Sequence, residues 1–376
     1  MGQTLTDRDN KDTVGIVLLN LGGPDSLYAV RPFLYNLFSD RDIIRLGPPL
    51  FQNPIARLIS VLRSKKTENM YSLIGGKSPI FDITGAQAEA LEKALNQKSE
   101  VRSQESEVNN YSPFTIHHSR SFKVYVGMRY WHPFIQDTVQ KVVGDGIRHI
   151  IVLSLYPHYS KATTGSSILE FKRAIKESYP PTHPSPSRGE GKGGGGIKVQ
   201  YIEQWYDFPP YIDALAELVS KGLSEFKEEN VDILYSAHSL PEKFIHEGDP
   251  YLKHIKATIT ALNSSLVTRH PGLALRSGAG SSLLRWNLAF QSKSGPVKWL
   301  QPATDETIIK LAQEGVKNLF VVPISFVSDH IETLYEIDVL YKKLAENHGI
   351  NLKRCPSLNT SEKFIKALKE LVLKEL

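Results

Sequence analysis

Short apolar runs alternate with amphipathic stretches along most of this chain. The runs are rich in Val, Ile and Leu and end in polar or turn-forming residues, which is typical of buried strands. The predicted strands are Val14–Leu19, Lys123–Gly127, His149–Leu155, Lys198–Ile202, Val231–Tyr235, Trp286–Phe290 and Leu319–Phe326. Helical spacing of apolar residues predicts helices at Thr84–Leu95, Pro133–Val143, Ser167–Ser178, Tyr211–Phe226, Asp305–Glu314 and Lys363–Leu376. This alternation predicts an α/β fold class with doubly wound parallel sheets that helices cover on both faces.

Three stretches without any apolar period interrupt this pattern, at residues 96–121, 180–196 and 264–282. We interpret them as surface insertions without chemistry, because lengthening a surface loop costs little free energy. The second, PPTHPSPSRGEGKGGGG, is rich in glycine but lacks the spacing of a phosphate-binding loop. No motif therefore predicts nucleotide binding.

Composition narrows the classes of protein that fit. The chain has 376 residues, enough for two ordinary domains, and its formal charge of +5 is spread along the sequence, which argues against a nucleic-acid partner. The single cysteine, Cys355, excludes an internal disulfide and a cysteine-ligated iron–sulfur cluster, and it fits a reducing compartment. The first twelve residues are polar, and no apolar run approaches the ~20 residues of a membrane span. We therefore expect a cytoplasmic protein.

Two predicted buried strands end in histidines. The strand Leu319–Phe326 runs into Ser328, Asp329 and His330 and then into a helix with Glu332 and Glu336, which share one face because they are four residues apart. The strand Val231–Tyr235 runs into His238 and is broken by the following proline. Alone, each pattern is more typical of a structural feature, a helix cap in the first case and a packing histidine in the second. Together they favour a site, because open α/β sheets place ligands at the carboxyl ends of their strands.

Other segments bring aromatic and cationic residues to predicted strand ends. YVGMRYWHP contains Arg129 and Tyr130, and FQSKSGPVKWL contains Lys293 and Trp299. Each segment alone is more typical of a structural turn. Taken together, they suit a flat apolar ligand that carries a few acidic groups.

The chain resembles the ferrochelatases, which insert ferrous iron into protoporphyrin IX. The segments that carry the resemblance are VGIVLLNLGGPDS, YSLIGGKSPI, YVGMRYWHP, LSLYPHYSKATTGSS, LYSAHSLPEKFIHEGDPY, LAFQSKSGPVKWLQPATDETI and VPISFVSDHIETLYEID. The resemblance implies two Rossmann-like domains of parallel four-stranded sheets with a cleft between them. We place these domains at residues 13–165 and 166–351, with residues 352–376 packing back on the first.

The resemblance also implies roles for individual residues. It implies that His238 and Glu332 are catalytic and bind the metal, with His330 and Glu336 as further metal ligands. It implies porphyrin-cleft positions at Arg129, Tyr130, Trp299 and Phe326, to which we add Lys293 for a propionate. Iron is then a substrate, no prosthetic group is needed, and Cys355 alone cannot hold the [2Fe–2S] cluster of animal members. One departure is Leu340, where several members continue the acidic row of this helix.

The chemistry of metallation suits these residue types. A neutral imidazole accepts a proton at physiological pH and is also a good ligand for ferrous iron, so the role of His238 stays open between base and ligand. For the propionates, Arg129 is favoured over Lys293 because a guanidinium pairs with a carboxylate bidentately.

The segment Ile43–Leu62 is apolar for its length and is followed by Arg63, Lys65 and Lys66. It is either a core helix or a hydrophobic lip that touches the inner face of a membrane, where the basic cluster would face anionic headgroups. The predicted partners are therefore protoporphyrin IX, ferrous iron and a membrane surface.

Two alternatives to protoporphyrin ferrochelatase remain, a coproporphyrin III ferrochelatase and a non-catalytic two-domain protein that binds tetrapyrrole or metal. The sequence predicts no oligomeric state.

Overall fold

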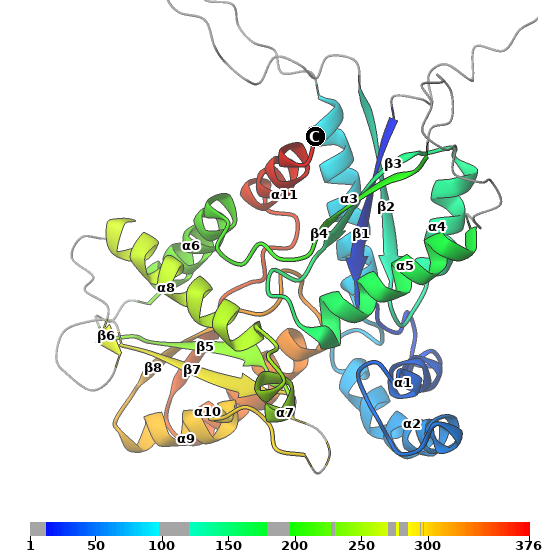
Figure 1. Ribbon diagram of the computed structural model, residues 1–376. Coiled ribbons are helices and arrows are strands. Elements are labelled where there is room, and N and C mark those ends of the chain that lie inside the picture. The colour runs from blue at the N-terminus through cyan, green and yellow to red at the C-terminus, as the bar shows by residue number, and fades with distance from the viewer. Residues whose placement is uncertain are drawn as a thin grey trace, which may run out of the picture.

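The computed structural model describes residues 13–97, 120–178, 196–226, 230–269, 276–277, 285–293, 295 and 297–376. Two parallel sheets lie beside each other, each with helices on both faces (Figure 1). The first sheet has the order β2-β1-β3-β4, with β1 at Thr13–Asn20, β2 at Ser121–Met128, β3 at His149–Ser154 and β4 at Lys198–Ile202.

The first sheet is doubly wound because β1 is apolar on both faces. Ile16 and Leu18 pack toward α3 (Ile80–Asn96), whereas Val17 and Leu19 pack toward α4 (Ile135–Gly144) and α5 (Ser166–Ser178). Alternate residues of a strand point to opposite faces, so a continuous apolar run is what a sheet covered on both sides requires.

The second sheet has five parallel strands where four were predicted, but the additional strand has only two residues. Its order is β6-β7-β5-β8-β9, with β5 at Asp232–His238, β6 at Arg276–Ser277, β7 at Arg285–Gln291, β8 at Asn318–Pro323 and β9 at Asn351–Arg354. One face packs on α6 (Pro209–Ser224) and α8 (Tyr251–Arg269). The other packs on α9 (Thr304–Gln313), α10 (Lys342–Asn347) and the π-helix η2 (Glu332–Tyr341).

The predicted boundary between residues 165 and 166 is wrong. Helix α5 packs on the first sheet, and β4 (Lys198–Ile202) pairs with β3, so the first domain extends beyond residue 202. A strand pattern does not reveal its pairing partner, and the boundary depended on that partner. The C-terminal helix α11 (Glu362–Lys374) does reach the first domain, where Lys369 Nζ donates to the carbonyl of Ala94 in α3 (Figure 1). Residues 352–354 belong instead to β9 of the second sheet.

The three predicted insertions lie mostly outside the described residues. Where the structure describes them, Asn96 ends α3, Ser121 begins β2, and residues 264–269 complete α8. The third insertion was therefore placed too early. Helix α8 was not predicted, although Ile255, Ile259, Leu262 and Leu266 follow helical spacing and are buried.

Helices α1 (Val30–Ser39) and α2 (Pro49–Ser72) follow β1 in the first domain. Helix α2 buries polar residues and exposes its leucines, which is the reverse of a core helix. Its buried residues include Gln52, whose side chain bonds the carbonyls of Phe38 and Ile44. Its leucines face outward, with Leu50 at 87% and Leu62 at 71% exposure. The core-helix interpretation of this segment is therefore wrong. None of the helices in the described ranges is both long and apolar enough to cross a membrane.

Candidate functional site

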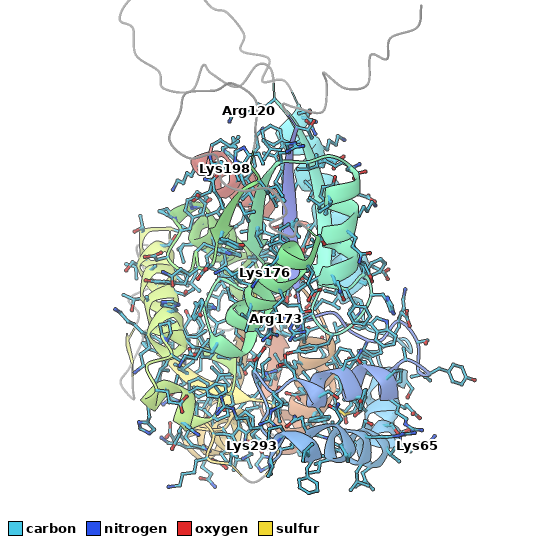
Figure 2. The ribbon with its side chains drawn as sticks, turned by 45° about the vertical axis from the view of Figure 1, so that its right-hand side comes forward. Lys65, Arg120, Arg173, Lys176, Lys198 and Lys293 are labelled. Carbon is cyan, nitrogen blue, oxygen red and sulfur yellow. The ribbon has the colours of Figure 1, made fainter. Side chains whose placement is uncertain are left out.

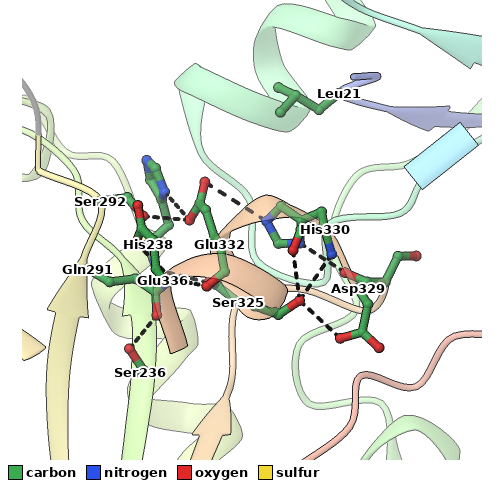
Figure 3. Close-up of polar contacts among 12 residues, drawn as sticks. Leu21, Ser236, His238, Gln291, Ser292, Ser325, Asp329, His330, Glu332 and Glu336 are labelled. Atoms are coloured by element: carbon green, nitrogen blue, oxygen red, sulfur yellow. Dashed lines mark hydrogen bonds and ion pairs between the residues drawn. The ribbon is translucent and has the colours of Figure 1, made fainter. Parts of the chain in front are cut away.

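The site forms where three neighbouring strands of the second sheet end. His238 is the last residue of β5, Gln291 is the last of β7, and β8 stops at Pro323, before the turn that leads to His330. The predicted strand Leu319–Phe326 is therefore shorter than expected, and Phe326 lies in the turn. Because the strands are parallel, their carboxyl ends bring these side chains to one edge (Figure 3).

Glu332 lies between the two predicted histidines. Its Oε2 is 2.8 Å from Nδ1 of His238, and its Oε1 is 3.9 Å from Nε2 of His330 (Figure 3). The Phe326 ring makes edge contacts with both imidazoles. The His238 side chain keeps 33% of its surface exposed and that of Glu332 keeps 15%, so the pair is accessible to a ligand from one side.

Glu332, His238 and His330 shift one another's pKa values. Burial alone would raise the pKa of Glu332, but the charge and the hydrogen bond of His238, with His330 nearby, lower it to about 2. Burial alone would lower the pKa of His238, but the Glu332 carboxylate raises it. Burial prevails at His330 and lowers its pKa. Glu332 is therefore ionised, and His238 is the more basic of the two imidazoles.

Ser292, which the sequence reasoning missed, joins the two acidic residues of η2. Its Oγ is 2.8 Å from Oε2 of Glu332 and 2.6 Å from Oε2 of Glu336, and its φ of 65° lies in the left-handed region. The shared contact confirms that Glu332 and Glu336 lie on one face, although the segment is a π-helix. Burial, followed by the charge of Glu332, raises the pKa of Glu336 to about 7. The signal in the sequence was the position of Ser292, two residues after the end of the predicted strand Trp286–Phe290.

The predicted metal ligands meet in pairs. His238 contacts Glu332, His330 lies near Glu332, and Glu336 reaches Glu332 through Ser292. Within the described ranges, no three His, Cys, Asp or Glu side chains converge on a point that would hold a metal ion. Binding of iron by this group stays a prediction.

Arg129 and Tyr130 form a separate cluster around Asp40 of the first domain. Nη2 of Arg129 lies 2.8 Å and the hydroxyl of Tyr130 lies 2.7 Å from Oδ2 of Asp40, and Arg129 also donates to Ser166. The cluster borders a cavity of about 500 Å³. Tyr130 is buried, so its ring offers no open face to a macrocycle in this structure.

Trp299 and Lys293 border another cavity of about 400 Å³. Trp299 forms an isolated bridge with Pro241, in the turn that follows His238. Its indole N–H is buried and has no acceptor among the described residues. The Lys293 side chain is 47% exposed and pairs with Glu306.

The first domain contributes two tyrosines to this region, Tyr71 from the segment YSLIGGKSPI and Tyr156 from LSLYPHYSKATTGSS, to which the sequence reasoning assigned no individual role. Burial, and then the charge of Glu332, raises the pKa of both Tyr71 in α2 and Tyr156 in the turn after β3. Leu21, directly after β1, also belongs to the first-domain side of this region (Figure 3). The His238 and Glu332 pair therefore lies at the junction of the two domains.

Comparison with known proteins finds similar sequences and a shared fold. The sequence model of the ferrochelatase family matches residues 13–376. Proteins named ferrochelatase from Geotalea daltonii and Desulfotalea psychrophila are 46% and 45% identical, across 96% of this chain and 97% and 96% of those proteins. One from Synechocystis is 42% identical, across 96% of this chain and 82% of that protein. Among solved structures, SirB from Bacillus subtilis with Fe³⁺ has a TM-score of 0.51 at 12% identity, across 96% of this chain and 95% of that one, which shows a shared fold.

Proposed function

The chain belongs to the ferrochelatase family of porphyrin metal chelatases, and we propose that it inserts ferrous iron into protoporphyrin IX, with His238 and Glu332 as the reacting groups. The observation that carries this assignment is the 2.8 Å contact between His238 Nδ1 and Glu332 Oε2 at the junction of the domains. Phe326 packs edge-on against both imidazoles there, so a flat apolar ligand has an aromatic neighbour.

Metallation requires the two pyrrole N–H protons to leave the macrocycle. With the Nδ1 proton of His238 donated to Glu332, the Nε2 atom is left to accept a proton, and it has no partner among the described residues. The Glu332 carboxylate fixes the ring and stabilises the imidazolium that forms. We therefore assign His238 as the proton acceptor, and Glu332 with His330 as the groups that meet the iron.

Of the two candidate cations for the porphyrin propionates, Lys293 is the more accessible. The Arg129 side chain is only 14% exposed and already pairs with Asp40, so a propionate would have to compete with a buried carboxylate. Lys293 pairs only with an exposed glutamate, beside the cavity that Trp299 borders. This reverses the order that the sequence favoured.

The exposed apolar face of α2 supports two parts of the proposal. These are the choice of protoporphyrin, the less polar substrate, and a peripheral contact with the inner face of a membrane. Leu50, Leu58 and Leu62 are exposed on this helix, and Lys65 follows Leu62 within one turn, toward the same end of the molecule as Lys293 (Figure 2). An apolar face with flanking cations binds anionic bilayers. The Leu62→Asp variant should sediment less with anionic vesicles than the wild type, and Leu169→Asp, an exposed leucine on α5, is the matched control. Equal sedimentation of the two variants would refute this contact.

The function is tested by anaerobic haem formation from ferrous iron and protoporphyrin IX. We expect wild-type turnover, its loss in His238→Ala and its retention in His246→Ala, which removes an exposed histidine from α7 (Glu242–His246). Tight porphyrin binding without wild-type turnover would indicate a binding protein. Faster turnover of coproporphyrin III, which carries four carboxylates, would assign the chain to that substrate instead.

A further inference from the structure

The main chain of His238 is held from both sides by side chains of other elements. Its N–H donates to Oγ of Ser325 at 2.9 Å, and its carbonyl accepts from the hydroxyl of Tyr251 at 2.9 Å. Tyr251 is the first residue of α8 and is 5% exposed. The reacting imidazole therefore extends from a peptide unit whose position depends on α8.

A buried carboxylate connects Tyr251 to the first domain. Oδ1 of Asp249 accepts from the backbone N–H of Tyr251 at 3.0 Å. Its Oδ2 accepts from the Ser160 hydroxyl at 3.0 Å and from the Lys161 backbone N–H at 2.8 Å. Ser160 caps the π-helix η1 (Lys161–Gly165), which begins at Lys161 and continues into α5 of the first domain. One carboxylate thus joins the turn after β3 to the start of α8.

The surrounding contacts show that this connection belongs to a buried interface between the turn after β3 and helix α8. Nδ1 of His254 accepts from the backbone N–H of Tyr159 at 3.2 Å, and Nε2 of His158 lies 2.9 Å from the hydroxyl of Thr258. His158, His254 and Thr258 are all buried. Because this interface excludes water, its polar contacts fix the position of the turn after β3 relative to α8.

We propose that Asp249 and Tyr251 are positioning residues that couple the placement of the first domain to the orientation of His238. The inference rests on the proposed function, because it assigns a role in the same reaction. Both residues lie in the GDPY part of the segment that also contains His238, and neither touches Glu332 in the described structure. A reacting group that is displaced by about 1 Å can lose up to about a hundredfold in rate, so a contact to its peptide unit is enough to matter.

Tyr235 provides a matched control for the loss of a buried tyrosine hydroxyl. It lies on β5, is buried, and donates to Oδ1 of Asn263 on α8 at 2.5 Å. Tyr235→Phe therefore breaks a hydrogen bond across the same interface between β5 and α8 without changing the contacts of His238. A merely structural role for Tyr251 predicts that the two phenylalanine variants behave alike.

The test compares Tyr251→Phe, Asp249→Asn, the double variant and Tyr235→Phe in anaerobic steady-state turnover and thermal melting. We expect kcat to fall about tenfold in Tyr251→Phe, the rate equivalent of one hydrogen bond, with KM for iron and porphyrin unchanged. The double variant should be no slower than the slower single variant, because both changes break one connection. Tyr235→Phe should melt at a similar temperature to Tyr251→Phe and keep the wild-type kcat. Unchanged kcat in Tyr251→Phe, or equal losses in both variants, would overturn the proposal.

A second readout does not depend on activity. The ¹⁵N resonances of the His238 ring in the free protein should move in Tyr251→Phe and stay in place in Tyr235→Phe. An unchanged His238 signal in Tyr251→Phe would refute the coupling even if the wild type forms no haem, whereas a shifted signal with an inert wild type would reject the proposed function alone.

Discussion

Replacing Glu336 with glutamine should stabilise the folded protein at pH 8 but not at pH 4.5. Glu336 is partly buried beside Glu332, and burial together with that neighbouring charge raises its pKa from the ordinary 4.5 to about 7. Between these two values the unfolded chain has released a proton that the folded chain still holds. The stability from this group is therefore fully present below pH about 4.5 and is lost as the pH rises to about 7.

The size of the effect follows from the same two pKa values. Each pH unit between them costs about 1.4 kcal/mol of folding free energy, so the wild type loses up to about 3 kcal/mol above pH 7. Glutamine keeps the shape of the side chain and can still accept a hydrogen bond from Ser292, but it carries no charge to desolvate. The Glu336→Gln variant should therefore be more stable than the wild type by up to about 3 kcal/mol at pH 8.

Guanidinium denaturation of the free protein at several pH values measures this difference. The gap between variant and wild type should be small at pH 4.5 and should widen to its full size by pH 8. Glu346→Gln, which removes an exposed glutamate from the adjacent helix α10, controls for the general loss of a negative charge. A gap that is the same at every pH, or a wild type that is the more stable protein at pH 8, would refute the reasoning.

Two further predictions concern the surroundings of this group. Ser292→Gly should be about 1 kcal/mol more stable than Ser292→Ala, because only glycine adopts the φ of 65° without strain. Both variants should raise KM for iron. Equal denaturation midpoints of the two variants would contradict the strain argument. Arg354 lies between Asp329 and Asp338, with contacts of 2.8 Å to each. Arg354→Ala should cost about 3 kcal/mol in denaturation experiments, because it leaves the charge of the largely buried Asp329 side chain without its cation. Arg173→Ala breaks a half-exposed pair and should cost about 1 kcal/mol or less, so similar losses in the two variants would argue against a special role for Arg354.

The fold class and the centre of the site were both predictable from local patterns. Apolar runs such as Val14–Leu19 have the composition of a strand whatever their partners are. His238 and Glu332 come at or after the ends of buried strands. In a parallel sheet the ends of neighbouring strands meet at one edge, so the sequence alone predicts that these side chains lie close together. Helix α8 also had a readable period and was open to prediction from the same rule.

Contacts between distant segments required the tertiary structure. The pairing of β4 with β3 moved the domain boundary, and the fold turned the apolar residues of α2 outward while burying Gln52. Ser292 reaches both glutamates only because β7 ends beside η2. The sequence by itself determined which segments are strands or helices and which side chains follow strand ends, because those properties depend on neighbours in the chain. Only the tertiary structure decided which groups form hydrogen bonds, shift one another's pKa values or pack together. Those interactions depend on distances of a few ångströms between residues that are far apart in the sequence.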